Sequence, residues 1–585
     1  MDGSYQESLF KAMSSPDFYP HPVQSVTEKE THISKVFLTG EVVYKIKKAV
    51  DLGFLDFSSV TKRQQCCEQE VSLNRRLAQG VYLGVAPITH CGGRFRLYGP
   101  GEAIEHAVRM RQLPDHQSLA AKIQQGVVTV AQIEALAHRL TDFFEQQGST
   151  GPEMAAACRD HVRSACEENF RQTRSVIGDV LDPEQYRAVR SATRLFLDHQ
   201  KALFDARSES GKIYDGHGDL RTGHIYFDDS GKFRIIDCIE FNSRLRHIDI
   251  ASDLAFLAMD LDASKAPKLG DALLKVYVRR TADRQAYALI PFYKCYRAMV
   301  RCKVNCIHLK KRTIGKSAAM DARERAALYL ALAERYAQQF ARPTLWVLCG
   351  LPGAGKSTLA RTLSKTLLID ALRSDVIRKQ HLRQDPEFRS AAGFEQGLYS
   401  PQAHRLTYTK MLLKARAALE QNQSVIVDAT FSEPDNRRKA MDLADELDCR
   451  IVFAECTAPA HILKTRLAQR EGRVSVSDAR LHHYELLNRR YIPPDEVKPA
   501  LRIRVETTRP AHDCIDQLLS RQCAGAPART GDAQQTTAKT VSKGGRHVQN
   551  NSGGNRSHHR TRSTGGSGSP SGRREQRPAC HSPCP

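Results

Sequence analysis

The chain has 585 residues, of which 41% are hydrophobic and 26% charged, so it is too long for one core and ordinary in composition for a globular protein. No run of uncharged apolar residues reaches the roughly 18 that a membrane helix needs, and the first residues lack the basic and apolar regions of a secretory signal. The net charge is +22, and residues 523–585 carry +8 of it, from ten Lys and Arg against two Asp and Glu. The remaining positive charge is spread along the rest of the chain and is too dispersed for a nucleic-acid-binding stripe.

The 16 cysteines are unevenly spaced, which favours a reducing compartment over a disulfide framework. We therefore expect a cytoplasmic protein that does not associate with membranes. Nucleic acid is a less favoured partner than a small molecule, and the sequence does not predict the oligomeric state.

The first part of the chain mixes strand-like and helical patterns. The segment KVFLTGEVVYKIKKAV, residues 35–50, predicts a hairpin that turns at Thr39 and Gly40. The segment QQCCEQEVSLNRRLAQG predicts a helix that Gly80 ends.

Helical periodicity then dominates residues 118–205 and 252–335, and the last of these helices should stop before Pro343. Three cysteines in the second region have the spacing of an apolar helix stripe rather than that of a metal site: Cys295, Cys302 and Cys306.

Between the two helical regions, the segment YDGHGDLRTGHIYF places polar groups between short apolar runs, and FRIIDCIEFN follows it as a strand carrying Asp237. The two carboxylates suit different tasks in phosphoryl transfer. Asp219 can take or orient the proton of an acceptor hydroxyl, and Asp237 can bind the Mg²⁺ that bridges the phosphates. We expect His217 to orient its neighbours, and Asp249 and Asp253 to cap a helix and brace the loop.

With these motifs and the segments VYKIKKAVDLGFLDFS, CIEFN and IASDLAFLAMDL, residues 30–310 resemble the aminoglycoside phosphotransferase family, part of the protein-kinase-like fold. The resemblance implies a strand lysine that pairs with a helix glutamate and contacts the nucleotide phosphates. Glu70 is the matching glutamate. Lys45 and Lys47 alternate onto one face of a strand, so either can be its partner, and we favour Lys45.

This family has an asparagine as second metal ligand five residues after the loop aspartate, where this chain has His224. Imidazole is a poor ligand for Mg²⁺ but a good one for softer ions. Three outcomes are open: a single Mg²⁺ held through Asp237, Mn²⁺ or another transition metal in its place, or a weakly catalytic binding module.

After residue 343 the pattern changes to short apolar runs (LWVLC, SVIVDA, RIVFAEC and LRIRVE) separated by long helical segments, which is typical of a parallel sheet with crossover helices. GLPGAGKST matches the phosphate-binding loop of P-loop enzymes. Lys356 should reach the β- and γ-phosphates of ATP, and the Ser357 hydroxyl should bind Mg²⁺. The nucleotide-binding residues predicted here are Gly350, Gly353, Ala354, Gly355, Lys356, Ser357 and Thr358.

Further residues point to the same site. Asp428 is placed to hold the metal through water, although it can simply end a strand, and Asp375 can accept a proton from a substrate hydroxyl. Arg466 and Arg470 project from one helix face, either over a transferring phosphoryl group or as a solvated basic surface. Residues 343–510 resemble P-loop small-molecule and polynucleotide kinases, including gluconate-kinase-like and zeta-toxin-like enzymes, which implies that Asp375 is the proton acceptor and the two arginines form a lid.

The sequence therefore predicts a multidomain protein of the α+β and α/β classes, similar to bacterial fusions of an aminoglycoside phosphotransferase-like domain with a P-loop ATP-binding domain. The expected parts are a kinase-like domain over 1–335, a P-loop domain over 343–515 and a disordered basic tail over 523–585. We expect ATP and Mg²⁺, or Mn²⁺ at the first site, to serve phosphoryl transfer to a small hydroxylated molecule. The alternatives are a P-loop ATPase with a degenerate nucleotide-sensing or scaffolding module, and a kinase acting on nucleic-acid ends.

Overall fold

The computed structural model describes residues 4–53, 55–228, 231–310, 315–381, 400–469 and 480–525. Contacts group these described residues into one compact unit. The tail expected over 523–585 lies outside the described residues except for its first three, of which Cys523 and Ala524 end the last helix. No described helix is long and apolar enough to cross a membrane.

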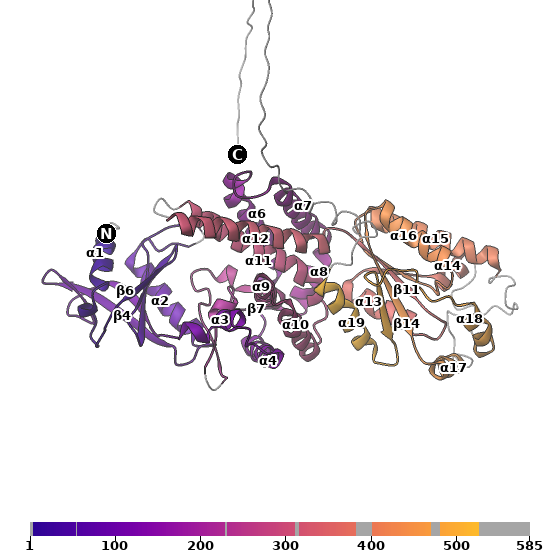
Figure 1. The fold of residues 1–585 in the computed structure, drawn as a ribbon, viewed down its shortest axis with the longest axis horizontal. Coiled ribbons are helices and arrows are strands. Elements are labelled where there is room, and N and C mark those ends of the chain that lie inside the picture. The colour runs from indigo at the N-terminus through magenta and orange to yellow at the C-terminus, as the bar shows by residue number, and fades with distance from the viewer. Residues whose placement is uncertain are drawn as a thin grey trace, which may run out of the picture. The chain divides into compact units, whose positions relative to one another are not determined.

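The N-terminal part is built around a six-stranded antiparallel sheet with the order β1-β2-β3-β6-β4-β5. Figure 1 labels β4 and β6 of this sheet beside α1 and α2. Helix α1 packs on one face of the sheet and helix α2 on the other. The elements are α1 (Ser4–Met13), β1 (Thr27–Glu30), β2 (Ser34–Leu38), β3 (Val42–Lys47), α2 (Val60–Asn74), β4 (Tyr82–Cys91), β5 (Arg94–Leu97) and β6 (Ala103–Arg111).

Strand β3 alternates its side chains between the two faces of this sheet. Tyr44 and Ile46 enter the core under α1, whereas Val43 enters the core under α2. Because Lys45 and Lys47 follow Val43 at the period of a strand, both ammonium groups lie on the α2 side.

The predicted hairpin is confirmed, since β2 and β3 pair antiparallel and Gly40 has a φ of +100° in the turn. The predicted helix end is wrong: α2 ends at Asn74, before Gly80. The Asn74 side chain donates to the Glu70 carbonyl and accepts from the Cys238 N–H at 2.9 Å. The helix therefore ends where a residue is held by a loop that is distant in sequence.

The middle of the chain is mainly helical, as its periodicity predicts. Helix α12 ends before Pro343, and the three cysteines of the apolar stripe are buried in the core. The helices are α3 (Leu119–Gln124), α4 (Val130–Gln147), α5 (Pro152–Ala156), α6 (Cys158–Thr173), α7 (Pro183–His199), α8 (Lys201–Glu209), α9 (Ile250–Ala263), α10 (Pro267–Thr281), α11 (Ala286–Leu309) and α12 (Lys316–Phe340).

Two short antiparallel pairs frame the polar loop between α8 and α9. Strand β7 pairs with β10, and β8 pairs with β9. The strands are β7 (Ile213–Asp215), β8 (Ile225–Phe227), β9 (Phe233–Ile235) and β10 (His247–Asp249).

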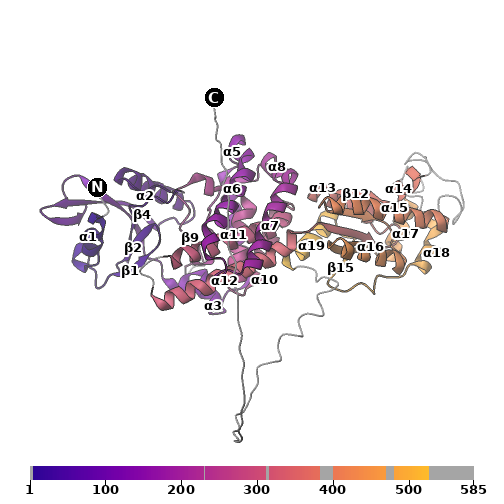
Figure 2. The same cartoon turned by 90° about the horizontal axis from the view of Figure 1, so that it is seen from above.

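The C-terminal part contains the predicted parallel sheet, in the order β12-β13-β11-β14-β15. Figure 2 labels its outer strands, β12 and β15. Trp346 and Leu348 of β11 enter the core with α13 and α19, whereas Leu345 and Val347 enter the core with α15 and α16. Helices therefore cover both faces, which explains the continuous apolar character of the strands.

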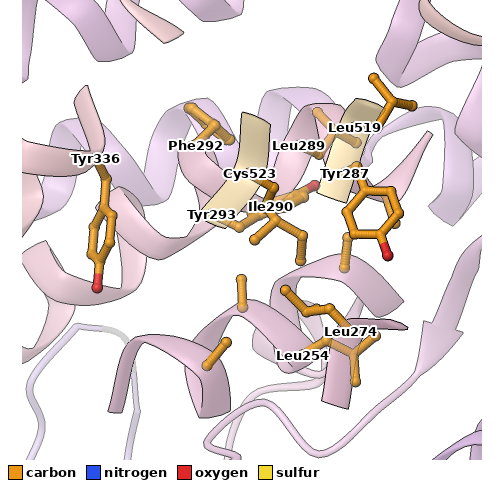
Figure 3. Close-up of a cluster of buried hydrophobic side chains, with 14 of the residues drawn as sticks. Leu254, Leu274, Tyr287, Leu289, Ile290, Phe292, Tyr293, Tyr336, Leu519 and Cys523 are labelled. Carbon is orange, nitrogen blue, oxygen red and sulfur yellow. The ribbon is translucent and has the colours of Figure 1, made fainter. Parts of the chain in front are cut away.

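The elements of this part are β11 (Thr344–Cys349), α13 (Lys356–Leu367), β12 (Asp370–Arg373), α14 (Ser374–His381), α15 (Pro401–Glu420), β13 (Val425–Asp428), α16 (Pro434–Glu446), β14 (Arg450–Thr457), α17 (Ala460–Ala468), α18 (Tyr484–Arg490), β15 (Arg502–Glu506) and α19 (Ala511–Ala524). Helix α19 also packs against the middle helices: Figure 3 shows Leu519 and Cys523 beside Tyr287 and Leu289 of α11. Arg284 forms an ion pair with Asp516 of α19 at 2.8 Å.

Candidate active sites

Four charged residues from distant parts of the chain meet beside the N-terminal sheet. Lys45 Nζ lies 2.8 Å from Glu70 Oε1 and 2.9 Å from Asp237 Oδ1. Lys47 contacts the other oxygen of Glu70 and also Glu240. Both lysines thus reach the predicted glutamate, and Lys45 joins it to Asp237 whereas Lys47 joins it to Glu240.

Burial and charge determine how this cluster ionises. Burial alone lowers the pKa of each lysine, but the surrounding carboxylates outweigh it and raise both values. Burial alone raises the pKa of Glu70, but Lys45 and Lys47 hold it below its usual range. Burial raises the pKa of Glu240, which Lys47 only partly opposes. The lysines are therefore charged at neutral pH.

The conformation of Asp237 differs from the prediction. Strand β9 ends at Ile235, so Asp237 lies in the loop after the strand rather than within it, and its φ is +60°. A non-glycine residue in this left-handed region is strained by about 1–2 kcal/mol. The Asp237 N–H donates to the Tyr82 hydroxyl at 3.2 Å, and the neighbouring Cys238 N–H to Asn74, and these contacts hold the turn.

The loop that carries Asp219 is held from behind by the start of α9. Asp253 accepts from the backbone N–H groups of His217 and Gly218 at 2.7 and 2.9 Å, as its predicted bracing role requires. A Cβ on Gly218 would lie 2.8 Å from the Leu245 carbonyl oxygen, so no larger residue fits without a shift. Asp249 caps α9 by accepting from Ala251 N–H.

His217 is fixed by backbone contacts on both ring nitrogens. Its Nε2 donates to the Ile236 carbonyl at 2.9 Å, and its Nδ1 accepts from the Asp219 N–H at 3.2 Å. Burial lowers the pKa of His217 to about 4. The ring is therefore neutral and orients the loop, as expected.

Asp219, Arg221 and His224 form a connected group. Arg221 donates to both carboxylate oxygens of Asp219, at 2.8 and 3.1 Å, and to His224 Nε2 at 2.6 Å. His224 Nδ1 donates to the Asp219 carbonyl at 3.0 Å, and its Nε2 lies 3.8 Å from Asp237 Oδ2. Burial alone raises the pKa of Asp219, but Arg221, His224 and Arg301 hold it well below its usual range.

Arg221 is a site residue that the sequence interpretation missed. The sequence did contain a signal for this role, because an arginine two positions after a loop aspartate can reach back to the carboxylate of that aspartate. Glu240, whose direction the sequence left open, is also part of the cluster through Lys47.

The glycine-rich loop lies between β11 and α13. Gly350 has a φ of +130°, and a Cβ there would lie 2.3 Å from the Cys456 carbonyl oxygen, so this glycine is sterically required. Lys356 Nζ donates to the carbonyls of Gly350 and Leu351 at 2.9 and 3.0 Å. Lys356 begins α13, so the helix N-terminus and the lysine charge face the concavity of the loop.

The predicted carboxylates lie at or just beyond the ends of two neighbouring strands, with Asp375 in the first turn of α14. Asp428 ends β13, and its side chain is hydrogen-bonded with Ser357. Burial raises the pKa of Asp428, against the lowering effects of Lys356 and Ser357. Asp375 follows β12 and accepts from Arg378 at 2.8 Å.

Arg466 contacts the phosphate-binding loop, and Arg470 lies outside the described residues. Arg466 Nη1 donates to the Gly353 carbonyl at 3.2 Å, and its Nη2 donates to the Thr507 carbonyl at 2.7 Å. It is therefore not a freely solvated cation. Next to it is a pocket of about 380 Å³ lined by Gly353, Gly355, Thr358, Leu359, Arg466, Gln469, Thr507, Arg509, Ala511 and Cys514. The sequence interpretation missed Thr507 and Arg509, which carry no motif.

Known proteins are similar to this chain in two ways: a family model matches the C-terminal part, and two relatives match most of the chain. A family model described as "AAA domain" matches residues 345–494, the P-loop part. The uncharacterized protein Rv2004c of Mycobacterium tuberculosis (strain ATCC 25618 / H37Rv) is 33% identical over 462 residues, covering 77% of this chain and 88% of the relative. The uncharacterized protein Mb2027c of Mycobacterium bovis (strain ATCC BAA-935 / AF2122/97) matches to the same extent.

Solved structures that are similar to this chain include two kinases. The Mycobacterium tuberculosis APS kinase CysC in complex with AMPPNP and APS is 18% identical, with a TM-score of 0.24, covering 31% of this chain and 97% of that one. A gluconokinase from Sinorhizobium meliloti 1021 is 14% identical, with a TM-score of 0.23, covering 31% of this chain and 91% of that one.

Proposed function

This chain belongs to the family of the mycobacterial proteins Rv2004c and Mb2027c, and from that premise we propose that it is an ATP-dependent phosphotransferase with two nucleotide sites. The first site belongs to an aminoglycoside phosphotransferase-like kinase domain over residues 1–335. The second belongs to a P-loop kinase domain over residues 343–515. Each transfers the γ-phosphoryl group of ATP to a hydroxyl of a small molecule.

The observation that carries the first site is the position of Lys45 between Glu70 and Asp237, at 2.8 and 2.9 Å. Glu70 holds the ammonium group of Lys45 toward the nucleotide phosphates. The acceptor oxygen bonds to the γ-phosphorus, the bond from that phosphorus to ADP breaks, and the hydroxyl proton leaves toward Asp219. Because the pKa of Asp219 is low, its ionised carboxylate first orients the hydroxyl and takes the proton only as the bond to phosphorus forms.

No group of three or more His, Cys, Asp or Glu side chains among the described residues is arranged as a metal site. We assign a divalent cation here to Asp237, with His224 beside it. Two carboxylates, Asp219 and Asp237, lie on either side of His224, within 3.7 and 3.8 Å of its ring nitrogens. A cation bound there supplies positive charge at the nucleotide phosphates. Because Arg221 donates to His224 Nε2, that nitrogen can bind a metal only after Arg221 turns toward a phosphate. An imidazole ligand favours Mn²⁺ over Mg²⁺.

In the P-loop domain, we assign the phosphates to the loop and to Lys356, and Mg²⁺ to Ser357 and Asp428, whose hydroxyl and carboxylate suit that ion. We place the nucleotide base in the pocket beside Gly355 and Thr358, because that pocket adjoins the phosphate-binding loop. Asp375 is the proton acceptor in this proposal, and Arg466 and Arg470 stabilise the transferring group.

Counting bound nucleotides tests the two-site proposal. Calorimetry on the whole chain should find two ATP molecules per chain, one removed by Lys45→Ala and the other by Lys356→Ala. A single bound nucleotide that is lost with Lys356→Ala would contradict the proposal for the first site.

A second candidate is favoured by one contact, the pairing of Asp219 with Arg221. If this pairing persists with nucleotide bound, the N-terminal domain is a nucleotide-sensing or scaffolding module. A screen of acceptors and divalent ions with the Lys356→Ala protein separates the candidates: ATP binding without transfer under Mg²⁺ or Mn²⁺ favours the sensor.

A further inference from the structure

Helix α11 carries an excess of positive charge close to the N-terminal site. Its 24 residues include four Lys and Arg residues and no Asp or Glu. Lys294 pairs with Asp262 at 3.1 Å, and Arg297 lies 4.0 Å from Asp253. Arg301 forms no ion pair among the described residues.

Arg301 is placed near the reacting groups by its spacing along the helix. Arg297 donates to the Gly218 carbonyl at 2.9 Å, so this face of α11 contacts the Asp219 loop. Arg301 lies one helical turn further along the same face. The charge of Arg301 is close enough to the Asp219 carboxylate to act on it.

The guanidinium of Arg301 is only partly satisfied by the protein. It lies over the Tyr329 ring, 5.7 Å from the centroid, and its Nε is buried without a hydrogen-bond partner among the described residues. A buried donor left without an acceptor destabilises a fold. An anionic ligand would supply the missing acceptor.

We propose that the acceptor at the N-terminal site is a hydroxylated small molecule that carries a phosphate or a carboxylate, and that Arg301 binds this anionic group. The inference rests on the phosphotransferase function proposed above and adds the class of its substrate. Lys45 and Glu70 mark the nucleotide side of the site, whereas Arg301 approaches Asp219 from the helical part. A polycationic acceptor would be repelled by Arg297 and Arg301.

Matched acceptors test the proposal in the full chain carrying Lys356→Ala, so that transfer from ATP reports the N-terminal site. The pairs are ribose with ribose 5-phosphate and glucose with gluconate, which separate phosphate from carboxylate, and a polycationic aminoglycoside is added. We expect kcat/KM to be roughly 10- to 100-fold higher for the anionic member of at least one pair, the range of a charged hydrogen bond.

In the same protein, Arg301→Gln should remove this preference by raising KM for the anionic acceptor, with KM for ATP and transfer to the neutral acceptor unchanged. Arg301→Lys should retain part of the preference. Arg187→Gln is the control, because Arg187 is exposed on α7 and donates to the Pro183 carbonyl of its own helix. If the Gln variant does not fold, the acceptor panel and the Lys variant decide.

Equal use of neutral and anionic acceptors, better use of the aminoglycoside, or an effect of Arg301→Gln on KM for ATP alone would overturn the acceptor class while leaving the phosphotransferase intact. Absence of transfer to every acceptor would overturn the proposed function itself, and the acceptor class with it.

Discussion

The two lysines of β3 should respond differently to replacement by methionine. Lys47 is fully buried and contacts Glu70 and Glu240, whereas Lys45 is 15% exposed and faces Asp237, which is 37% exposed. Breaking a buried ion pair by removing one partner costs about 3–5 kcal/mol, because the remaining charge is uncompensated. We expect Lys47→Met to destabilise the N-terminal sheet by about this amount, and Lys45→Met to lose nucleotide binding at a smaller cost in stability.

Thermal unfolding followed by far-UV circular dichroism measures the loss of stability in Lys47→Met, which corresponds to a decrease in Tm of roughly 6–15 °C. The fluorescence of Trp346, the single tryptophan, reports the C-terminal sheet and should change little. Calorimetry with ATP measures the expected effect of Lys45→Met, which is that one fewer nucleotide binds per chain.

The pH dependence of this stabilisation has a definite sign. The folded pKa of Lys47 lies above its unfolded value, because Glu240 and Glu70 outweigh burial. Its contribution is therefore present at neutral pH and is lost only as the pH rises through the folded pKa. Adding Glu240→Gln to Lys47→Met should restore part of the stability, since it removes the unpaired carboxylate. The reasoning is refuted if Lys47→Met is as stable as the parent, or if the double variant is less stable than Lys47→Met.

Gly218→Ala should lower phosphoryl transfer and reduce the free energy of unfolding by about 1–3 kcal/mol, since the new Cβ meets the Leu245 carbonyl and the backbone φ is +83°. Gly223→Ala is the control: there is open space around its Cβ, so activity and Tm should stay unchanged. Burial lowers the pKa of His217 to about 4, so the folded protein favours the neutral ring. The stability that this contributes is present above the unfolded pKa of about 6.5. Up to about 3 kcal/mol of the free energy of unfolding should therefore be lost as the pH falls from about 6.5 to 4. His217→Gln should flatten that part of the stability profile in urea titrations, and an unchanged profile would contradict the assignment. Asp428→Asn should abolish Mg²⁺-dependent ATP turnover by the P-loop site without shifting the Trp346 unfolding transition, and retention of turnover would exclude Asp428 as the metal holder.

Several features followed from local sequence alone. The hairpin at Gly40 and four of the five parallel strands, β11, β13, β14 and β15, are set by turn residues and by runs of apolar side chains, which act over a few residues. The alternation of side chains along a strand is enough to place Lys45 and Lys47 on one face of β3. The glycines, the lysine and the helix start of the phosphate-binding loop lie within nine consecutive residues, Gly350 to Thr358, so that motif is a local prediction as well.

Other features depended on contacts between distant segments. Helix α2 ends at Asn74 because that side chain meets Cys238, and Asp237 leaves its strand for a left-handed conformation held by Tyr82. The direction of Arg466 toward Gly353 likewise follows from packing between α17 and the loop. Periodicity cannot predict such contacts, since it carries no information about which loops meet in space.

By itself, the amino-acid sequence determined which residues are available for phosphate and metal chemistry and on which face of each element they lie, because those properties depend on residue type and local backbone geometry. Only the tertiary structure decided that Lys45 faces Asp237 while Lys47 is buried with Glu240. It also decided that Arg221 forms an ion pair with Asp219. These pairings depend on the packing of the sheet, α2 and the loops against one another, and the free energy of burying each charge is defined only once that packing is complete.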